Sequence, residues 1–510
     1  MITDNPVAAG TRIMATKTLR IPLFGSLINR NVNPSFFSTK DQIFTNGYPE
    51  VVTNSISGKA KVTLNKRPGP TAGTALTGVV SGTYASCFWD SATTSPIVLA
   101  FANTGSTSCS VWQSNATKVG GDIANTSACL SLTSTSISGV GTLVGIFVDS
   151  GTSALEAWYF PEGGAWTQIT DADFPPNLGT PEPLIGAPVH LNGRMYVMTT
   201  NGKIWNSDLN TLTNWTASAF NTAQSYPDGG VGLARYKNLI VAFGQYSIEF
   251  FQDVGLTPSP IVSIGNAGNR IGAIFPTSIL LRTIFSVSNT VYFMGVNSET
   301  GTQGVYRLNG FLAEKVSNAA IDKLVNSGII LGFKGAFTLH GMSHILMNTT
   351  VTTHPIFCIE TNTWWNLTAG VVPTTIVGAL GNSYFAGSTA KLYTINAGAP
   401  VYQDDGVAYT MTAQLDNVDC GTTKRKIWKR IRPYGHDIQA AASNLSISYS
   451  DDDGANYSTA RTIDLNSQSA IEQGLTRLGS SRRRSWKIEH AANTPYRGEG
   501  VEVDFEECSS

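Results

Sequence analysis

Two histidines are the first residues whose types and spacing could hold a metal. His340 and His344 are four residues apart, the spacing of zinc-binding histidines on one face of a helix. Gly341 lies between them, in a segment that we expect to be a β-hairpin, where this spacing does not aim both side chains at one ligand. We interpret both histidines as ordinary turn residues and assign no metal site.

An acidic run, Asp451-Asp452-Asp453-Gly454, suggests a calcium loop at first. An EF-hand loop requires acidic residues at alternating positions, a distant Glu and flanking helices, and these are missing. The spacing Ser450-x-Asp452-x-Gly454-x-x-Tyr457 is instead similar to the Asp-box hairpin of sialidase-like propellers. In that motif the Asp holds a tight turn and the aromatic ring packs beneath it, so we expect a structural role.

Enzymatic chemistry has no clear candidate. Glycosidases need two carboxylates about 5 to 9 Å apart, a distance that a sequence does not reveal. Sialidases also need clustered arginines, yet residues 75–280 contain only Arg194, Arg235 and Arg270. No GxSxG, P-loop or HExxH motif is present. We therefore expect no enzyme activity and assign no catalytic, cofactor-binding or metal-binding residue.

Two basic clusters near the carboxyl terminus could contact DNA phosphates. They are residues 424–432 and the triplet Arg482, Arg483 and Arg484. We favour a solvated sheet face or a protein interface, because acidic residues that could pair with these clusters lie nearby in the sequence. These acids are Glu489, Glu499, Glu502, Asp504, Glu506 and Glu507. Trp215 and Trp365 could stack on sugars, but we interpret them as core residues at the ends of repeated units.

The composition predicts an all-β protein. The 510 residues include 50 Gly, and Ser, Thr and Asn are abundant, a mixture that favours short strands and tight turns over long helices. Only 14% of residues are charged and the formal net charge is −1, so bulk attraction to nucleic acid or acidic membranes is not indicated.

Neither membrane insertion nor secretion is expected. No apolar run approaches the roughly 20 residues that span a bilayer, and residues 1–11 lack the pattern of a secretory signal. The six cysteines are far apart and form no CxxC pair. We expect free thiols made in a reducing cytoplasm, and one disulfide among Cys87, Cys109 and Cys129 is the alternative.

The order of strand and turn patterns divides the chain into three parts. Residues 1–74 are interrupted by prolines and are interpreted as an extended arm with one strand near residues 59–64. Residues 75–402 carry a degenerate repeat whose units start roughly 40 to 55 residues apart, as in propeller blades. We predict an irregular six- or seven-bladed β-propeller-like body, with a pair of β-sandwiches as the rival. The units run from Tyr84 to Trp112, Leu143 to Trp166, Val189 to Trp215, Leu239 to Phe251, Ile284 to Leu308, Phe337 to Trp365 and Ile376 to Ile395.

Two further segments depart from the repeat. Residues 319–325 favour a short helix inside the body. Residues 403–510 are richer in charge and carry strand patterns at residues 409–415, 446–449 and 501–505. These patterns predict a separate, β-sandwich-like carboxyl-terminal domain.

Short motifs spread over nearly the whole chain resemble, in order, those of one family. They are residues 20–25 (RIPLFG), 39–42 (TKDQ), 46–50 (NGYPE), 66–69 (KRPG), 238–244, 247–251 (SIEFF), 304–310 (GVYRLNG), 316–318, 450–457, 482–486 (RRRSW) and 495–499 (PYRGE). The chain resembles the tail-hub or nozzle proteins of short-tailed bacteriophages, a family of packaged-DNA stabilisation proteins. The Ser/Thr/Gly-rich residues 71–140 have no counterpart in this resemblance.

The resemblance implies a structural virion protein of the phage tail, assembled in the host cytoplasm without cofactors. It implies a homohexameric ring below the portal and adaptor proteins, which retains packaged DNA, extends the ejection channel and docks tail fibres or spikes. DNA would pass through the lumen without sequence recognition. The alternative is a polysaccharide-binding or -cleaving propeller of the sialidase or depolymerase kind. A bacterial surface adhesin is disfavoured by the missing signal peptide.

Overall fold

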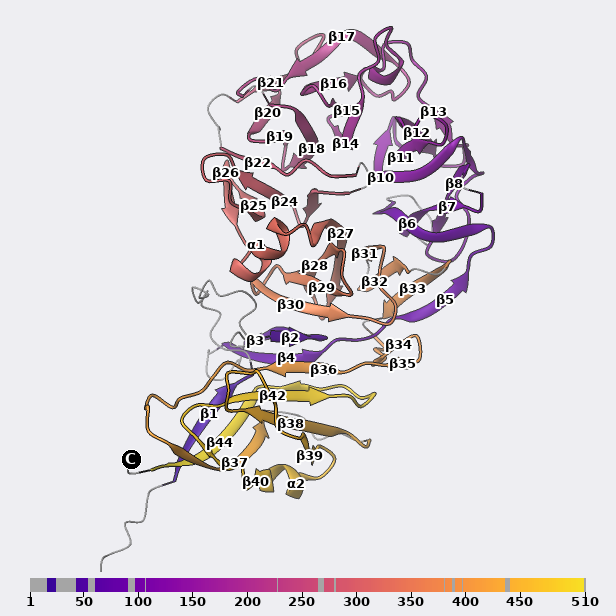
Figure 1. The fold of residues 1–510 in the computed structure, drawn as a ribbon. Helices are drawn as coiled ribbons and strands as arrows, with labels where there is room; N and C mark the ends of the chain where they lie inside the picture. Colours follow the sequence, from indigo (N-terminus) through magenta and orange to yellow (C-terminus); the bar gives the residue numbers. More distant parts are fainter. Residues whose placement is uncertain are drawn as a thin grey trace, which may run out of the picture. The chain divides into compact units, whose positions relative to one another are not determined.

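The computed structural model describes residues 16–23, 43–53, 60–89, 97–105, 107–226, 228–264, 270–278, 281–379, 381–387, 390–396, 398–435 and 441–508. These residues are mostly β-structure, as predicted, and they fold into two compact units (Figure 1). Unit 2 contains the described residues of Pro68–Val407, and unit 1 combines the described residues up to Arg67 with those of Ala408–Ser510. The motif at residues 39–42 and the end of the motif at residues 20–25 lie outside the described residues.

Unit 2 begins with sheets of four antiparallel strands that follow one another along the chain (Figure 1). Tight turns join their strands. Asn192 and Gly193, for example, both have positive φ values of 50° and 77°, as the two central residues of a type I′ hairpin turn require. The first sheet contains β6 (Val79–Phe88), β7 (Ile97–Asn103), β8 (Ser108–Gln113) and β9 (Ile123–Ala124), and the second contains β10 (Thr126–Ile137), β11 (Val140–Asp149), β12 (Leu155–Pro161) and β13 (Thr167–Gln168). The third sheet contains β14 (Leu184–Leu191), β15 (Arg194–Thr199), β16 (Lys203–Ser207) and β17 (Trp215–Thr222). The fourth contains β18 (Gly230–Tyr236), β19 (Leu239–Gly244), β20 (Ile248–Asp253) and β21 (Ile261–Ser263).

The remaining strands of unit 2 also form groups of neighbours in sequence, except that the last group takes its outer strand from the beginning of the unit. The next two groups contain β22 (Ile271–Ala273), β23 (Ile284–Val287), β24 (Thr290–Asn297), β25 (Gln303–Asn309) and β26 (Leu312–Lys315), followed by β27 (Ile330–Leu339), β28 (Met342–Thr349), β29 (Thr353–Cys358) and β30 (Thr363–Thr368). The last group contains β31 (Thr375–Ala379), β32 (Asn382–Ala386) and β33 (Lys391–Asn396), and its outer strand is β5 (Thr71–Ala75) from the beginning of the unit. A short ladder of β34 (Gln403–Asp404) and β35 (Val407–Ala408) follows.

The position of β5 differs from the predicted division of the chain. Residues 71–74 were expected in the amino-terminal arm, yet Thr71 and Ala72 pair with Thr394 and Tyr393. A hydrophobic cluster that includes Leu76, Phe101 and Leu392 joins the last sheet to the first. Pairing across more than 300 residues leaves no local pattern, because the hydrogen-bonding partner is far away in the sequence.

One strand from each group contacts a strand of the next group, and these contacts follow a cyclic order. Along the chain β6, β10, β14, β18, β23, β27 and β31 each contact the next, and β31 contacts β6. Close approach requires glycine at some of these contacts. Gly335 has a φ of 143°, and a methyl group there would lie 1.9 Å from the carbonyl oxygen of Ile376. Only a residue without a Cβ atom therefore fits between β27 and β31.

The core of unit 2 lies between successive sheets rather than at one centre. One cluster joins Val144 and Ile146 of β11 to Val197 of β15 and includes Trp215, and Trp365 is buried elsewhere in the unit, so the expected core positions of both tryptophans are confirmed. The predicted helix near residues 319–325 is α1 (Ala319–Asn326), whose first turn is capped by the side chain of Asn318. A 3-10 turn, η1 (Pro175–Asn177), lies between β13 and β14.

Unit 1 is built from both ends of the chain. One sheet has the order β1 (Lys17–Pro22), β44 (Gly500–Glu507), β37 (Lys426–Tyr434) and β40 (Leu475–Thr476), and β41 (Ser480–Ser481) also pairs with β37. A second run has the order β39 (Arg461–Asp464), β38 (Asn444–Ser450), β42 (Ser485–His490), β36 (Met411–Gln414) and β2 (Ile43–Thr45). A third sheet contains β3 (Gly47–Thr53), β4 (Ala60–Lys66) and β43 (Arg497–Gly498), and α2 (Gln468–Gln473) precedes β40.

These pairings correct the expectation of an extended amino-terminal arm. Lys17 lies opposite Phe505 and Ile43 opposite Gln414, so β1 and β2 are members of carboxyl-terminal sheets. The prolines did not prevent strand formation, because Pro22 ends β1 and Pro49 lies in β3, at the edge of its sheet. None of the helices in the described residues has the length and apolarity needed to cross a membrane.

Candidate functional site

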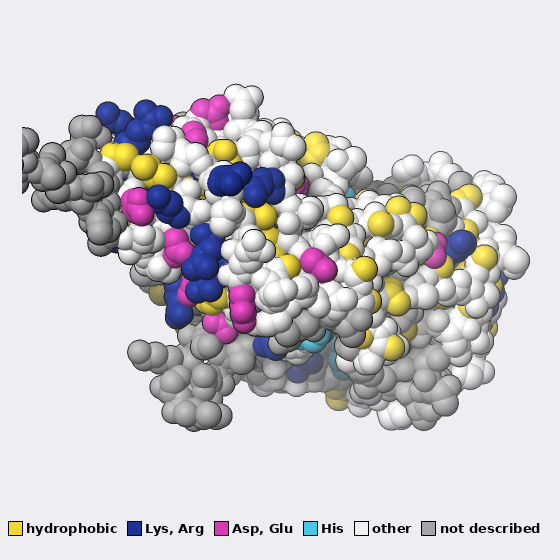
Figure 2. All heavy atoms as spheres, turned by 90° about the horizontal axis from the view of Figure 1, so that it is seen from below, with side chains coloured by type: hydrophobic (Ala, Val, Ile, Leu, Met, Phe, Trp, Pro, Cys, Tyr) yellow, Lys and Arg dark blue, Asp and Glu magenta, His cyan; other side chains and the backbone are white. Residues whose placement is uncertain are grey.

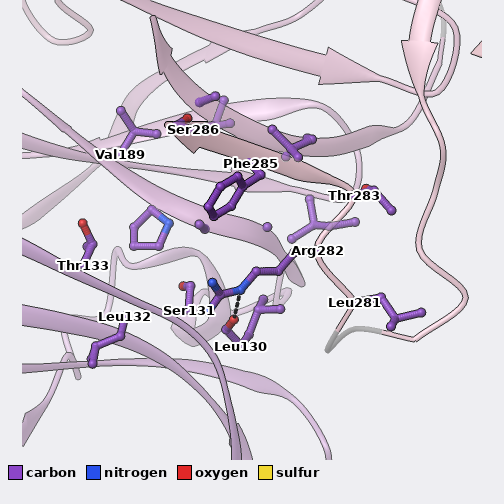
Figure 3. Close-up of a pocket in the computed structure, with 18 of the residues that line it drawn as sticks. Leu130, Ser131, Leu132, Thr133, Val189, Leu281, Arg282, Thr283, Phe285 and Ser286 are labelled. Atoms are coloured by element: carbon purple, nitrogen blue, oxygen red, sulfur yellow. Dashed lines mark hydrogen bonds between the residues drawn. The ribbon is translucent and has the colours of Figure 1, made fainter. Parts of the chain in front are cut away.

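A cavity of about 680 Å³ lies at the centre of unit 2. Its walls come from one strand of each group, and residues of β6, β10, β14, β18, β23, β27 and β31 all contribute. Figure 3 labels lining residues of β10, β14 and β23. Most lining side chains are apolar, including Leu132, Val189 and Phe285. We call this space the axial cavity. It has the size of a small-molecule site, and both strands and the segments between them line it.

Arg282 is the most unusual lining residue. It lies two residues before the start of β23, and its Nε donates a hydrogen bond of 3.1 Å to the backbone oxygen of Leu130 (Figure 3). The ladder between β10 and β11 shifts register between Cys129 and Ser131, which is the signature of a β-bulge. The shift leaves Leu130 without a partner residue in the register, so its carbonyl can accept the bond from Arg282. Burial lowers the pKa of Arg282, although an arginine keeps its charge at neutral pH.

Further polar groups lie on the same walls. The hydroxyl of the buried Ser131 and Nε2 of His190 have no hydrogen-bond partner within the described part of the protein. Arg235 donates to the backbone oxygens of Lys237 and His190, at 3.1 and 3.5 Å. Burial and then the nearby charge of Arg235 lower the pKa of His190. The described lining residues include these two arginines and no Asp or Glu.

The chemistry of the axial cavity therefore differs from that of a glycosidase. Its described lining contains no pair of carboxylates, so no Asp or Glu there could act as the general acid and general base of glycoside hydrolysis. Sequence reasoning missed Arg282, because it lies just beyond the segment 75–280 in which arginines are scarce. A signal was present in the sequence: Arg282 lies within the apolar run of residues 279–285, where a charge is uncommon.

The two histidines do not form a metal site. His340 occupies the turn between β27 and β28 with a φ of 45°, and its side chain is exposed. His344 is buried in β28 between the rings of Phe337 and Trp365, with centroids 5.5 and 5.7 Å away. Burial lowers the pKa of His344 to about 4. The described residues contain no group of three or more His, Cys, Asp or Glu that could hold a metal ion.

The segment 450–457 has the hydrogen bonds of a structural turn. The hydroxyl of Ser450 donates to Asp452 at 2.5 Å and accepts from the backbone N–H of Gly454 at 2.8 Å. Asn456 donates to Asp452 through its backbone and side chain, at 2.9 and 2.7 Å. These bonds, Ser450 first, lower the pKa of Asp452 to about 2. Every described side-chain hydrogen bond of Asp452 lies within the turn between β38 and β39, so Asp452 has the structural role that we expected.

Three cations of the basic cluster at residues 424–432, namely Lys429, Arg430 and Arg432, are paired with acids of the neighbouring strand. Glu502 of β44 binds Arg20 of β1 and Arg432 of β37, each at 2.7 Å. Burial acts to raise the pKa of Glu502, but hydrogen bonds from these two arginines outweigh burial and lower it. The adjoining pairs are Lys17 with Glu507, Lys429 with Glu506 and Arg430 with Asp504. Figure 2 shows Lys and Arg side chains interspersed with Asp and Glu on one face.

The other basic residues of unit 1 separate into buried and exposed members. Arg484 is buried, binds Asp451 through two bonds of 2.7 and 2.8 Å, and lies 3.8 Å from the ring centroid of Tyr449. Lys426 is also buried, and its ammonium donates to the backbone oxygens of Thr422, Lys424 and Arg482. Arg482 and Arg483 are exposed, and Arg483 binds Asp453. Arg484 and Lys426 are therefore internal supports and not DNA-binding residues.

All six cysteines are free thiols. Cys109 and Cys129 are buried in the cluster between the first two sheets, and burial raises the pKa of both. The disulfide alternative among the first three cysteines is wrong, and none of these thiols has the lowered pKa of a nucleophile.

The model of a family described as "Phage_stabilise: Bacteriophage P22 Gp10, beta-propeller" matches residues 59–328. The tail hub protein gp10 of Salmonella phage P22 is 29% identical over 120 residues, which cover 22% of this chain and 23% of that protein. The matched segment thus spans less than a quarter of this relative.

Two solved structures share little with the chain. The computationally designed Ika8 protein aligns with 64% of this chain and 99% of its own, at 10% identity and a TM-score of 0.35. Raptor from Chaetomium thermophilum aligns with 64% of this chain and 29% of its own, at 10% identity and a TM-score of 0.38. Likeness at this level carries no conclusion about the fold.

Proposed function

Because the chain belongs to the bacteriophage P22 Gp10 family of β-propeller phage stabilisation proteins, we propose that it is a structural tail-hub protein of the phage virion. It forms a homohexameric nozzle ring below the portal and adaptor, retains packaged DNA, extends the ejection channel and docks tail fibres or spikes. The observation that carries this proposal is the family match over residues 59–328, more than half of the chain.

The geometry of unit 2 supports a rigid building block. We infer seven blades, the last completed by β5, because the first strands contact one another cyclically and β5 pairs with β33. Joining the start of the unit to its last sheet closes the ring, because the first and last blades cannot separate without breaking the pairing of β5 with β33. A closed ring of sheets tolerates load during DNA packaging and ejection better than open sheets with free edges.

The charge distribution supports passage of DNA without sequence recognition. The basic residues of β1 and β37 that could attract phosphates are paired with acids of β44. Such pairing reduces the net field that would hold a polyanion, and low net charge acts the same way. The proposed protein is not an enzyme, and the polysaccharide-cleaving alternative has no carboxylate pair in the described lining of the axial cavity.

The test is the mass of the purified protein in solution, alone and with its portal–adaptor complex, measured by light scattering after size-exclusion chromatography. A six-fold mass, either alone or only on the adaptor, is the expected result. A persistent monomer that does not bind the adaptor contradicts the proposal. A variant whose propeller is damaged, Gly335→Ala, serves as the control, because specific assembly should be lost when unit 2 is not intact.

A further inference from the structure

The two units carry net charges of opposite sign. Residues 68–407 contain 18 Asp and Glu against 12 Lys and Arg, whereas the rest of the chain contains 22 Lys and Arg against 17 Asp and Glu. We propose that a basic hollow on unit 1 binds an acidic region on unit 2 of a second copy of this chain. The inference rests on the proposed ring, and it names the surfaces that join neighbouring copies.

The basic hollow lies beside β37. Its volume is about 590 Å³, and it is lined by Ile427 and Lys429 of β37 and, from the segment of β40 and β41, by Thr476, Arg477 and Ser480. The side chain of Ile427 is 38% exposed there, in an otherwise polar surface. An exposed apolar group among cations favours a protein partner, which covers the apolar surface as well as the charges.

Three arginines surround the basic hollow without acidic partners. Arg477 lines it, Nε of Arg425 donates to the hydroxyl of Ser480 at 3.1 Å, and Nη1 of Arg461 donates to the backbone oxygen of Thr476 at 2.6 Å. All three side chains are exposed and form no ion pair within the described structure, unlike the cations of β37 that pair with β44. Because two of them are already held at the rim, little side-chain freedom is lost when an acid binds.

The acidic region belongs to the second sheet of unit 2. Residues 119–193 contain seven Asp and Glu and not one Lys or Arg. Four of these acids are half-buried and form no ion pair within the described structure: Asp149, Glu156, Asp171 and Asp173.

The strand order brings these four acids to one end of the sheet. Asp149 is the last residue of β11, and Glu156 is the second residue of β12. Asp171 and Asp173 follow β13 within five residues. Since β11, β12 and β13 are antiparallel neighbours, the end of β11, the start of β12 and the end of β13 lie at the same end of the sheet. We call these four residues the acidic end.

A second copy supplies what each region lacks. Burial and then the charge of Asp149 raise the pKa of Glu156, so the acidic end carries repulsion that a neighbouring cation relieves. The guanidiniums around the basic hollow repel one another in the same way. Each copy can offer its basic hollow to one neighbour and its acidic end to the other, which is the head-to-tail contact from which closed rings are built.

The experiment uses two charge-reversed variants of the full chain. The basic-hollow variant carries Arg425→Glu and Arg477→Glu, and the acidic-end variant carries Glu156→Lys and Asp173→Lys. Each variant alone brings like charges together at every contact of a head-to-tail ring, so its assembly should weaken at least about tenfold. Mixed in equal amounts, the two variants can alternate around a six-membered ring, every contact again joins opposite charges, and the six-fold mass should return in light scattering.

A matched control separates this contact from a general effect of charge. Lys237→Glu with Arg270→Glu changes the net charge of the chain as much as the basic-hollow variant does, at exposed positions of unit 2, and should assemble like the unmodified chain. Circular dichroism checks that each variant is folded, and Asp173→Lys alone replaces an acidic-end variant that is not.

The outcomes distinguish this inference from the proposed function. Normal assembly of either variant alone, or a mixture of folded variants that does not recover assembly, overturns the inference and leaves the ring intact. An unmodified chain that stays monomeric, alone and with the adaptor, contradicts both.

Double-stranded DNA is the competing occupant, because arginines without acidic partners also bind phosphates. Fluorescence anisotropy with a labelled DNA duplex, at about 0.15 M salt, measures DNA binding by the unmodified chain and by the basic-hollow variant. We expect no difference between the two. Binding that the basic-hollow variant loses, while its assembly is unchanged, would assign the hollow to DNA and overturn the proposal.

Discussion

The two units of this protein use opposite means to hold β-sheets together. Unit 2 repeats small sheets with apolar clusters between them, and residues 68–407 contain only 12 of the 34 Lys and Arg residues. Unit 1 is smaller but buries two cations, Arg484 and Lys426, and Arg484 lies next to the large rings of Trp428 and Trp486. It also carries a ladder of ion pairs on the sheet of β1, β44 and β37.

The difference follows from how each unit is closed. Successive sheets in unit 2 are neighbours in sequence, so apolar alternation and tight turns suffice until β5 completes the last sheet. Strands in unit 1 come from opposite ends of the chain, and paired charges can specify which strand lies beside which. Oppositely charged cross-strand partners favour the observed register, and a one-residue shift would place Arg430 and Arg432 opposite apolar residues such as Val503.

The largest effect is expected where unit 2 tolerates no side chain. Gly335→Ala would place a methyl group 1.9 Å from the Ile376 carbonyl oxygen, at a φ that L-residues rarely adopt. We expect a loss of about 3 kcal/mol or more, confined to unit 2. Hydrogen exchange measured by mass spectrometry would assign the loss to a unit. Gly341→Ala also has positive φ but meets no atom within 4 Å, so it should cost only about 1 kcal/mol. Equal costs would show that the contact between β27 and β31 is not tight.

The next effect concerns the buried cation of unit 1. Arg484→Met removes both bonds to Asp451 and the bond to the Leu478 carbonyl while keeping much of the apolar contact. We expect unit 1 to lose about 2 kcal/mol, because the buried Leu478 carbonyl loses its partner while the exposed Asp451 becomes solvated, and unit 2 is unchanged. Arg483→Gln, at an exposed pair, should cost less than about 1 kcal/mol. Denaturant unfolding followed by tryptophan fluorescence tests both, and a neutral Arg484→Met would mean that apolar packing alone holds this core.

Acid should weaken unit 2 through its buried histidines. Burial lowers the pKa of His344 to about 4 from an ordinary value near 6.5, so the unfolded chain takes up this proton first as the pH falls. The loss of stability therefore begins near pH 6.5, continues to about pH 4 and reaches about 2 kcal/mol at pH 5 for this residue. Above pH 7 the histidine contributes no pH dependence.

A variant isolates this contribution, because His354 in unit 2 and His490 in unit 1 have lowered pKa values for the same reason. His344→Gln should flatten the stability profile of unit 2 between pH 6.5 and 4, whatever its effect at neutral pH. His340→Gln, at the exposed turn position, should keep the original slope. Identical slopes for the two variants would exclude His344 as the titrating group.

The smallest effect is the salt dependence of the ion-pair ladder. Glu502→Gln removes the charge that Arg20 and Arg432 share, and we expect a loss of about 1 kcal/mol in unit 1 at low salt. Salt screens such pairs, so most of this difference should vanish in 1 M sodium chloride. Glu299→Gln, which breaks an exposed pair with Arg270 in unit 2, should be close to neutral at every salt concentration. A salt-independent loss at Glu502 would point to packing instead of charge.

Local patterns in the sequence predicted much of the fold. Each of the seven expected units corresponds to a group of neighbouring strands, because period-two alternation and Asn-Gly turns act within a few residues. The helix at α1 was predicted for the same reason, since its cap at Asn318 and its buried Ile321 and Val325 are encoded locally. The structural turn at Asp452 also followed from residues within eight positions of one another.

Long-range pairing and burial were decided only by the tertiary structure. Nothing near Thr71 indicates a partner at Thr394, and nothing near Lys17 indicates Phe505, because strand partners are chosen by the closure of each sheet. The same holds for the charges: Arg483 and Arg484 are neighbours in sequence, yet one is exposed and the other is buried against Tyr449. The position of Arg282 in the lining of the axial cavity was likewise decided in space, because strands from distant segments build that lining.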